Sequence, residues 1–261
     1  MDLGLSNAVA IVTGASRGIG LAVTRELVAN GAQVVAGARR SSEGLDELVE
    51  AGAVEFVATD LSSPEGVDAL VTAAGRREHV DVLVNNVGGV TPRPDGFASV
   101  TDEEWLAAFT INVLTPVRML RAVLPFMLDA GRGSIVTVSS VNAFLPDPLV
   151  IDYSAAKAAL ANLSKSLSKE VGGRGIRVNT VSPGPVATDL WLGEGGVAQT
   201  VARATGADPA AVAAGAAGGA VTGRFTRPDE VARLICFLAS DAASNLTGAD
   251  VTIDGGLITT L

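Results

Sequence analysis

The sequence predicts an α/β fold in which a single doubly wound parallel sheet is covered by helices on both faces, giving three layers. Short Val/Ile-rich runs alternate with helical patterns from the start of the chain to its end. Hydrophobic residues make up 48% of the 261 residues but aromatic residues only 4%, so small and branched aliphatic side chains must fill the core. Neither an internal repeat nor a domain boundary is visible, so we expect one domain over residues 1–261.

The expected elements follow one another in strict alternation, which implies right-handed crossovers and a parallel sheet. Seven apolar runs fit buried strands, namely Val9–Val12, Gln33–Ala36, Val54–Ala58, Val82–Val84, Ser134–Val138, Arg177–Val181 and Asp250–Ile253. The segments between them fit six helices, namely Ile19–Asn30, Glu43–Ala51, Pro64–Arg77, Asp102–Asp129, Tyr153–Val171 and Asp229–Ser240. In open sheets of this kind, ligands bind beyond the carboxyl ends of the strands.

One segment breaks the alternation. From Ala187 to Thr222 the chain has no strand pattern and is rich in Ala and Gly. Long insertions in compact domains are usually functional or disordered, so this segment is either a flap over the site or a plain loop. We favour a helical flap over about residues 187–222.

Composition excludes several classes of function. The formal net charge is −9, with 28 acidic against 19 basic residues, which argues against nonspecific binding of nucleic acid. The N-terminal Met1–Ser6 lacks the basic start of a signal peptide, and no apolar stretch is expected to span a membrane. A single cysteine, Cys236, suits a reducing compartment and is expected to be buried in the core. We therefore expect a cytoplasmic protein, and the only histidine, His79, is expected in a solvated turn rather than in a metal site.

Two residues four positions apart, Tyr153 and Lys157, share one face of an expected helix. A free tyrosine has a pKa near ~10, and a nearby ammonium group lowers that value. Ser140, which closes the apolar run before this helix, could hold a carbonyl or hydroxyl group beside the phenol. The pattern indicates proton transfer to or from a small oxygen-bearing substrate.

A glycine-rich segment, Thr13-Gly-Ala-Ser-Arg-Gly-Ile-Gly20, joins the first expected strand to the first helix. Glycines allow the backbone to turn tightly and to approach a phosphate, and the helix N-terminus offers N–H donors and the positive end of its dipole. Together with the Tyr–Lys pair, this loop indicates a reaction that uses a nucleotide cofactor.

These motifs, in this order and at this spacing, resemble those of the short-chain dehydrogenase/reductase family over about residues 6–258. Further matching elements are Asp60-Leu61, Asn85-Asn86-Val87-Gly88, Asn112, Pro183-Gly184-x3-Thr188 and Asp254-Gly-Gly256. Val87 stands where the family usually has alanine. The resemblance implies a Rossmann fold and an oxidoreductase in which the nicotinamide cofactor transfers a hydride.

The resemblance also assigns roles to residues. Tyr153 would exchange a proton with the substrate oxygen, Lys157 would lower the pKa of Tyr153 and hold the nicotinamide ribose, and Ser140 would orient the substrate. Asn112 would kink the helix that contains it and anchor a relay water. Cofactor contacts are expected from Gly14, Ser16, Arg17, Gly18, Ile19, Gly20, Arg39, Arg40, Asp60, Leu61, Asn86, Gly88, Tyr153, Lys157, Pro183, Gly184, Val186 and Thr188. Asp60 resembles the family's adenine-contacting residue, which we favour over the alternative of a helix cap ahead of Pro64.

The choice of cofactor depends on the end of the second strand. Family members that use NAD place a carboxylate there, whereas this chain has Arg39 and Arg40. A carboxylate would repel a 2′-phosphate, and arginine binds phosphate through two parallel hydrogen bonds. With Arg17 in the glycine loop as a further basic residue, NADP(H) is the expected cofactor.

The substrate is expected to be a neutral or largely apolar ketone or alcohol, because the residues expected around the pocket are apolar and no charged residue is expected to enter it. These residues are Val90, Phe144, Leu145, Val150 and Trp191. A 3-oxoacyl-carrier-protein reductase is the main alternative, with Arg132 and Arg174 as basic residues that could flank the cleft. A nucleotide-binding regulator without catalysis is a further alternative, although such members commonly lose the Tyr or the Lys.

Assembly is expected from the two long helices, which pair with their copies across a two-fold axis in the family. The helix from Tyr153 to Val171 carries more alanine and leucine than a solvated helix needs. The apolar C-terminal segment Gly256–Leu261 could be buried by a further subunit. A homotetramer is therefore expected.

Overall fold

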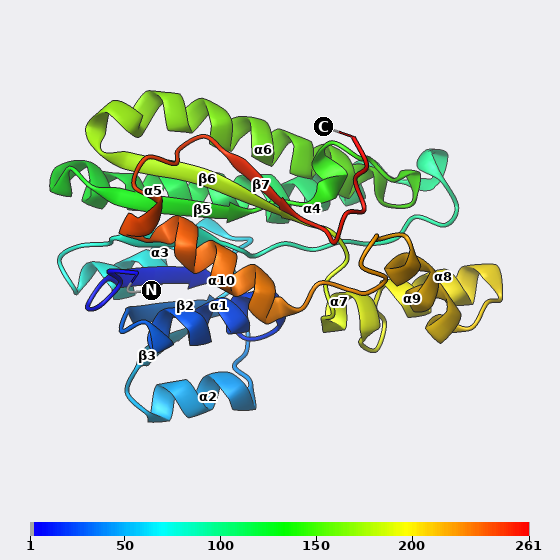
Figure 1. Ribbon diagram of the computed structural model, residues 1–261, viewed down its shortest axis with the longest axis horizontal. Coiled ribbons are helices and arrows are strands. Elements are labelled where there is room, and N and C mark those ends of the chain that lie inside the picture. The colour runs from blue at the N-terminus through cyan, green and yellow to red at the C-terminus, as the bar shows by residue number, and fades with distance from the viewer. Residues whose placement is uncertain (1–2, 261) are drawn as a thin grey trace.

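A computed structural model describes residues 3–260 and contains one seven-stranded parallel sheet with the strand order β3-β2-β1-β4-β5-β6-β7 (Figure 1). The strands are β1 (Val9–Thr13), β2 (Gln33–Ala38), β3 (Val54–Ala58), β4 (Val82–Asn85), β5 (Gly133–Val138), β6 (Ile176–Pro183) and β7 (Asp250–Ile253). The order reverses between β1 and β4, and such a switch point opens a crevice at the carboxyl ends of the two strands. The predicted fold class is confirmed.

Helices cover both faces of the sheet, as the alternating pattern predicts. On one face lie α1 (Gly18–Ala29), α2 (Glu43–Glu50) and α10 (Pro228–Ala239). On the other lie α3 (Pro64–Gly75), α5 (Thr115–Ala130) and α6 (Ile151–Val171). Observed boundaries differ from the predicted ones by at most three residues for these strands and helices, except where α4 and α5 replace one predicted helix.

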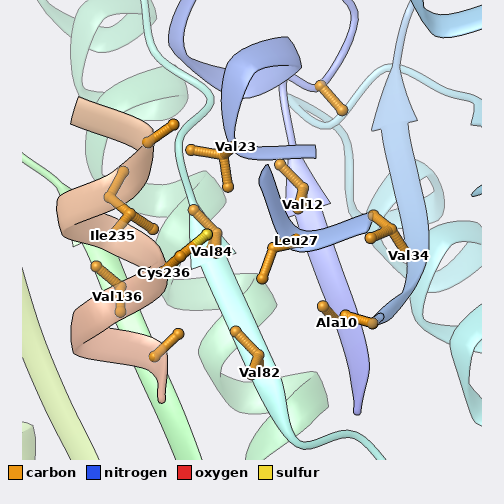
Figure 2. Close-up of a cluster of buried hydrophobic side chains, with 14 of the residues drawn as sticks. Ala10, Val12, Val23, Leu27, Val34, Val82, Val84, Val136, Ile235 and Cys236 are labelled. Carbon is orange, nitrogen blue, oxygen red and sulfur yellow. The ribbon is translucent and has the colours of Figure 1, made fainter. Parts of the chain in front are cut away.

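Small aliphatic side chains form the core between the sheet and its helices. Figure 2 shows this packing on the first face, where Leu27 of α1 and Ile235 of α10 lie against the valines of β1, β4 and β5. Cys236 belongs to the same buried cluster, and burial raises the pKa of its thiol to about 12. The prediction of a buried core cysteine is therefore confirmed.

The helix predicted over Asp102–Asp129 is interrupted. It consists of α4 (Asp102–Phe109), a π-helical turn η2 (Thr110–Leu114) and α5. π turns inside helices are frequent at functional sites, and this one contains Asn112. By length and composition alone the stretch Asp102–Ala130 could cross a membrane, but α5 buries its apolar side chains against the sheet.

The segment predicted as a flap is helical. It contains α7 (Asp189–Leu192), α8 (Val197–Thr205) and α9 (Pro209–Gly218), which lie beyond the carboxyl ends of the strands (Figure 1). At its base Val186 and Thr226 form an isolated parallel bridge, and Trp191 packs on Phe225 with ring centroids 5.5 Å apart. The chain thus leaves and re-enters the main body at one place.

Three residues named in the sequence analysis lie outside the described residues. They are Met1 and Asp2 at the N-terminus and Leu261 at the end of the predicted apolar C-terminal segment.

Candidate active site

The glycine loop ends in an open helix N-terminus. Gly14 and Gly18 have positive φ angles of 66° and 55°, which favour glycine. A Cβ atom on Gly20 would lie 2.1 Å from the carbonyl oxygen of Gly14, so no side chain fits there. The first turn of α1 carries no acidic residue and Arg17 at its N-cap makes no capping hydrogen bond, which leaves N–H donors for an anion.

The loop after β4 is tied to this glycine loop by Asn86. Its backbone N–H donates to Thr13 Oγ1 at 2.9 Å, and its side-chain amide donates to the carbonyl oxygens of Thr13 and Gly14. The predicted cofactor residues Gly14, Gly20 and Asn86 therefore lie together. Thr13 was not among the predicted site residues, although it opens the glycine motif.

The end of β2 presents two exposed arginines, Arg39 and Arg40, as predicted. Asp60 follows β3 and accepts hydrogen bonds from the backbone and side chain of Ser62, which lower the pKa of its carboxyl group, with a smaller contribution from Arg39. The N-cap of α3 is Ser63, so the alternative reading of Asp60 as a helix cap is wrong. The end of β2 is therefore followed by basic side chains and by no carboxylate over residues 39–42.

Asn112 is fully buried in the π turn and holds the loop after β4. Its side chain donates to the Gly89 carbonyl at 2.9 Å and accepts from the Gly89 N–H at 3.2 Å. A Cβ atom on Gly88 would lie 2.8 Å from Asn112 Oδ1 and 3.4 Å from Lys157 Nζ. Gly88, Asn112 and Lys157, which come from three different elements, are therefore immediate neighbours.

Tyr153 and Lys157 lie on the first turns of α6, and the Lys157 ammonium is 5.6 Å from the centre of the Tyr153 ring. Lys157 Nζ donates to the Val138 carbonyl at 2.8 Å, where β5 ends. Ser140 follows two residues later, and its hydroxyl donates to Asn142 Oδ1 at 3.1 Å. The structure thus brings Asn112, Ser140, Tyr153 and Lys157 to the carboxyl ends of β4 and β5.

The expected effect of Lys157 on Tyr153 is not the dominant one. Burial raises the pKa of Tyr153, and hydrogen bonding with the Ser140 side chain opposes that rise. Burial also lowers the pKa of Lys157 to about 8. Burial disfavours the charged form of each group, so in this structure the pKa of Tyr153 lies above its ordinary value, while a lowering of that pKa by Lys157 stays a prediction.

The segment after β6 returns to the glycine loop. A Cβ atom on Gly18 would lie 3.2 Å from Thr188 Cγ2, and one on Gly184 would lie 2.9 Å from Asp254 Cβ. Val186 is buried, and an open groove between α1 and this segment is lined by Gly18, Thr188 and Asp189. Of the predicted residues, Thr188 therefore borders this groove beside Gly18, whereas Val186 is buried and Gly184 packs against Asp254.

The residues predicted to line the substrate pocket differ in exposure. Phe144 and Leu145 are about half exposed, whereas Val150 is buried where α6 begins and Val90 is partly buried. Trp191 lies on α7 and packs on Phe225.

Charged residues that the sequence analysis did not name lie close to this region. Arg93, in the loop after β4, has a side chain only 11% exposed and forms ion pairs with Asp152 and Glu104. Asp152 immediately precedes Tyr153. Sequence reasoning missed these residues because their partners come from three separate segments; the one available signal was a charged residue next to the Tyr-x3-Lys motif.

Comparison with known proteins agrees with this geometry. A family model described as enoyl-(acyl carrier protein) reductase matches residues 14–258. The 3-oxoacyl-[acyl-carrier-protein] reductase FabG of Thermotoga maritima is 35% identical, with 97% of this chain and 99% of the relative covered. D-threitol dehydrogenase of Mycolicibacterium smegmatis is 36% identical, with 98% and 94% covered.

Among solved structures, the L-sorbose reductase of Gluconobacter frateurii in complex with NADPH and L-sorbose is similar over 100% of both chains. The TM-score is 0.91 and the sequence identity 34%. Fold, motif order, site geometry and relatives agree throughout. The chain belongs to the short-chain dehydrogenase/reductase family of oxidoreductases.

Proposed function

We propose that this protein is an NADP(H)-dependent oxidoreductase that interconverts a ketone and a secondary alcohol. The observation that carries the proposal is the convergence of Asn112, Ser140, Tyr153 and Lys157 beside Gly88, next to an open helix N-terminus. The NADPH complex of the related L-sorbose reductase supports the cofactor, and the related D-threitol dehydrogenase supports a small hydroxylated substrate.

NADP(H) would be held by two sets of groups. The N–H groups at the start of α1 and the loop Gly14–Gly20 would take the pyrophosphate, with Ser16 and Ile19 contributing backbone contacts. Arg39, Arg40 and Arg17 would bind the 2′-phosphate. The remaining proposed contacts are Asp60, Leu61, Asn86, Gly88, Pro183, Gly184, Val186 and Thr188; the side chain of Leu61 is buried, so its contact would come from the backbone.

The bound cofactor supplies the hydride, and the protein supplies position and a proton. Tyr153 donates the proton to the substrate oxygen or takes it from that oxygen. The Ser140 hydroxyl, which donates to Asn142 in the free protein, would donate to the substrate oxygen instead. Lys157, which is buried beside the Tyr153 ring, holds the nicotinamide ribose. Asn112 keeps the loop after β4 in place through its hydrogen bonds to Gly89. From this position we propose that it also holds a relay water.

The substrate would lie between Tyr153 and the helices of residues 187–222, which we propose act as a flap. Val90, Phe144, Leu145, Val150 and Trp191 are the proposed lining residues. Arg93 is fully engaged by two carboxylates, so no free cation is provided for an anionic substrate at this place. A neutral ketone or alcohol is therefore the proposed substrate class.

A 3-oxoacyl-carrier-protein reductase remains the second candidate, because relatives of that name are about as similar as the others. Its predicted docking residues do not support it within one protomer. Arg132 directly precedes β5, and Arg174 lies two residues before β6. Both therefore lie at the amino ends of the strands, opposite the site. Arg132 is also paired with Asp81.

We also propose a cytoplasmic homotetramer. The helical stretch Asp102–Ala130 is apolar yet only partly buried, and Phe97, Leu106 and Leu114 expose large apolar side chains on or beside it. An exposed apolar surface of this kind usually marks an interface.

The test of the proposed function is a screen of neutral ketones and secondary alcohols with NADPH and NADP⁺, run with wild type and Tyr153→Phe. We expect turnover by wild type and a loss of about 10²–10⁴-fold in kcat for Tyr153→Phe. Binding of NADPH by the variant should remain close to wild type, since only the phenol oxygen is removed. Turnover of the variant above about a tenth of wild type would contradict a general-acid role for Tyr153.

A further inference from the structure

Arg93 forms a buried ion pair with the residue that precedes Tyr153. Its Nε and Nη2 atoms lie 3.1 Å and 2.6 Å from Asp152 Oδ2. The Asp152 side chain is 2% exposed and that of Arg93 is 11% exposed. Charges this far from water persist only when they are paired, so the two residues depend on each other.

The same arginine connects three segments of the chain. Its Nη1 atom lies 2.5 Å from Glu104 Oε1 on α4, and its backbone N–H donates to the Leu149 carbonyl at 2.6 Å. Glu104 is itself fixed by the capping box of α4 with Thr101. Arg93 therefore joins the loop after β4, the start of α4 and the segment that leads into α6.

The cluster reaches Tyr153 through the second oxygen of Asp152. Asp152 Oδ1 accepts a hydrogen bond from the Tyr153 backbone N–H at 2.9 Å. Asp152 places a charge on the residue next to Tyr153, and an uncompensated charge roughly 10 Å from an ionising group, at an effective dielectric constant of ~20, changes the ionisation equilibrium of that group by about tenfold. Arg93 neutralises this charge.

We propose that Arg93 is a positioning residue of the reaction, which fixes the first turn of α6 through Asp152 and balances the negative charge beside Tyr153. The inference rests on the proposed function of Tyr153. The alternative is an ion pair that only stabilises the fold. The two differ in one property, because a pair that does not act on the phenol leaves the ionisation of Tyr153 in the folded protein unchanged.

The chain offers a direct probe, since Tyr153 is its only tyrosine. The ultraviolet difference spectrum of phenolate formation reports this one residue and needs neither substrate nor turnover, so its outcome is independent of the ketone screen. Lys157 and Asp152 on α6 and Ser140 after β5 are direct neighbours of Tyr153, whereas Arg93 after β4 is connected to it through Asp152, and Glu104 on α4 through Arg93.

The experiment is a charge cycle in which Tyr153→Phe serves as the spectral blank and circular dichroism confirms folding at each pH. The cluster of Arg93, Asp152 and Glu104 has one positive and two negative groups, a net charge of −1. Arg93→Gln makes it −2 and should raise the midpoint of Tyr153 titration by about one pH unit. Asp152→Asn makes it 0 and should lower the midpoint, and the double variant restores −1 and should return it close to wild type.

A matched control is Arg224→Gln, which breaks the paired contact of Arg224 with Glu230 beside α10 and should leave the midpoint unchanged. An unchanged midpoint in Arg93→Gln, or an equal shift in Arg93→Gln and the double variant, would overturn the proposal, since loosening of the fold would affect both alike. If Arg93→Gln does not fold, the near-isosteric Asp152→Asn decides: a fall in the midpoint supports the proposal, and no change or a rise contradicts it.

Discussion

Asn86 and Thr13 are 73 positions apart in the chain and bind each other twice, through the Asn86 backbone N–H to Thr13 Oγ1 and through the Asn86 side-chain amide to the Thr13 carbonyl, both at 2.9 Å. Thr13 ends β1 and Asn86 follows β4, so the contact closes the switch point of the sheet. Asn86, a residue from the other half of the fold, therefore helps to fix the conformation of the glycine loop.

Replacing Asn86 by alanine should therefore weaken cofactor binding, although the Asn86 side chain bonds the glycine loop and not the reacting atoms. The lost hydrogen bonds are expected to cost about 1–3 kcal/mol in NADPH affinity and in the free energy of unfolding. NADPH fluorescence titration measures the first and urea unfolding the second. The control is Asn30→Ala, which removes a side chain bonded to Glu26 at the end of α1 and should affect stability alone.

Gly20→Ala should abolish tight NADPH binding, because the new methyl group would lie 2.1 Å from the Gly14 carbonyl oxygen and force the loop open. Gly215→Ala is the matched control. Gly215 lies inside α9 with no neighbouring atom within 4 Å of a Cβ, so alanine should stabilise the chain by about 0.4–1 kcal/mol. Calorimetry of both variants with and without NADPH checks the pair. Wild-type affinity in Gly20→Ala would contradict the close packing of the loop.

Lys157 should make stability depend on pH. Burial lowers its pKa to about 8 in the folded protein, below its ordinary 10.5, so the unfolded chain binds the extra proton between these values. Its contribution to the free energy of unfolding therefore rises with pH in that window, by about 1.4 kcal/mol per pH unit. Above pH 10 the raised pKa of Tyr153 acts in the opposite direction.

The measurement compares wild type with Lys157→Met by urea unfolding at about pH 7 and pH 9.5. The variant has no buried ammonium group. The free energy of unfolding of wild type should therefore rise relative to that of the variant by about 2 kcal/mol between these two pH values. A difference that stays constant would mean that Lys157 titrates at its ordinary pKa.

Arg39→Ala tests the cofactor preference. Loss of a charge-assisted hydrogen bond to the 2′-phosphate should weaken NADPH binding by roughly 1.5–3 kcal/mol and leave NADH binding nearly unchanged. Arg25→Ala provides the comparison, because Arg25 is an exposed arginine on α1 that contacts Glu47 instead. A wild-type enzyme that prefers NADH would refute the assignment of Arg39.

Light scattering at micromolar concentration tests the assembly. The protomer mass is 26.3 kDa, and a homotetramer has four times that mass. Leu106→Glu, which places a charge among the exposed apolar side chains of α4, should shift the population toward smaller species. A wild-type mass of one protomer would end the proposal.

The sequence was sufficient for the order of strands and helices because buried parallel strands have a composition that surface segments lack, as in Val9–Thr13 and Ile176–Pro183. It also placed Tyr153 and Lys157 side by side on one helix, since the two residues are separated by one helical turn. Interruption of the helix at Thr110–Leu114 could not be derived from its composition, because the π turn depends on Asn112 reaching Gly89 in a distant loop.

Two other features depend on tertiary contacts in the same way. Arg93 has an ordinary loop context in the sequence, and only folding brings it to Asp152 and Glu104. The raised pKa of Tyr153 follows from burial, a property of the assembled site that spacing does not reveal. The positions of single helices and strands could be predicted from residue patterns, whereas ion pairs and pKa shifts that depend on contacts between distant segments could not.

The bridge between Val186 and Thr226 has an evolutionary consequence. The helices between these residues, from Asp189 to Gly218, leave the main body and return to it at one place, so their length and composition can vary without changing the register of the sheet. We therefore expect that exchange of these helices between relatives changes the substrate and leaves the sheet intact.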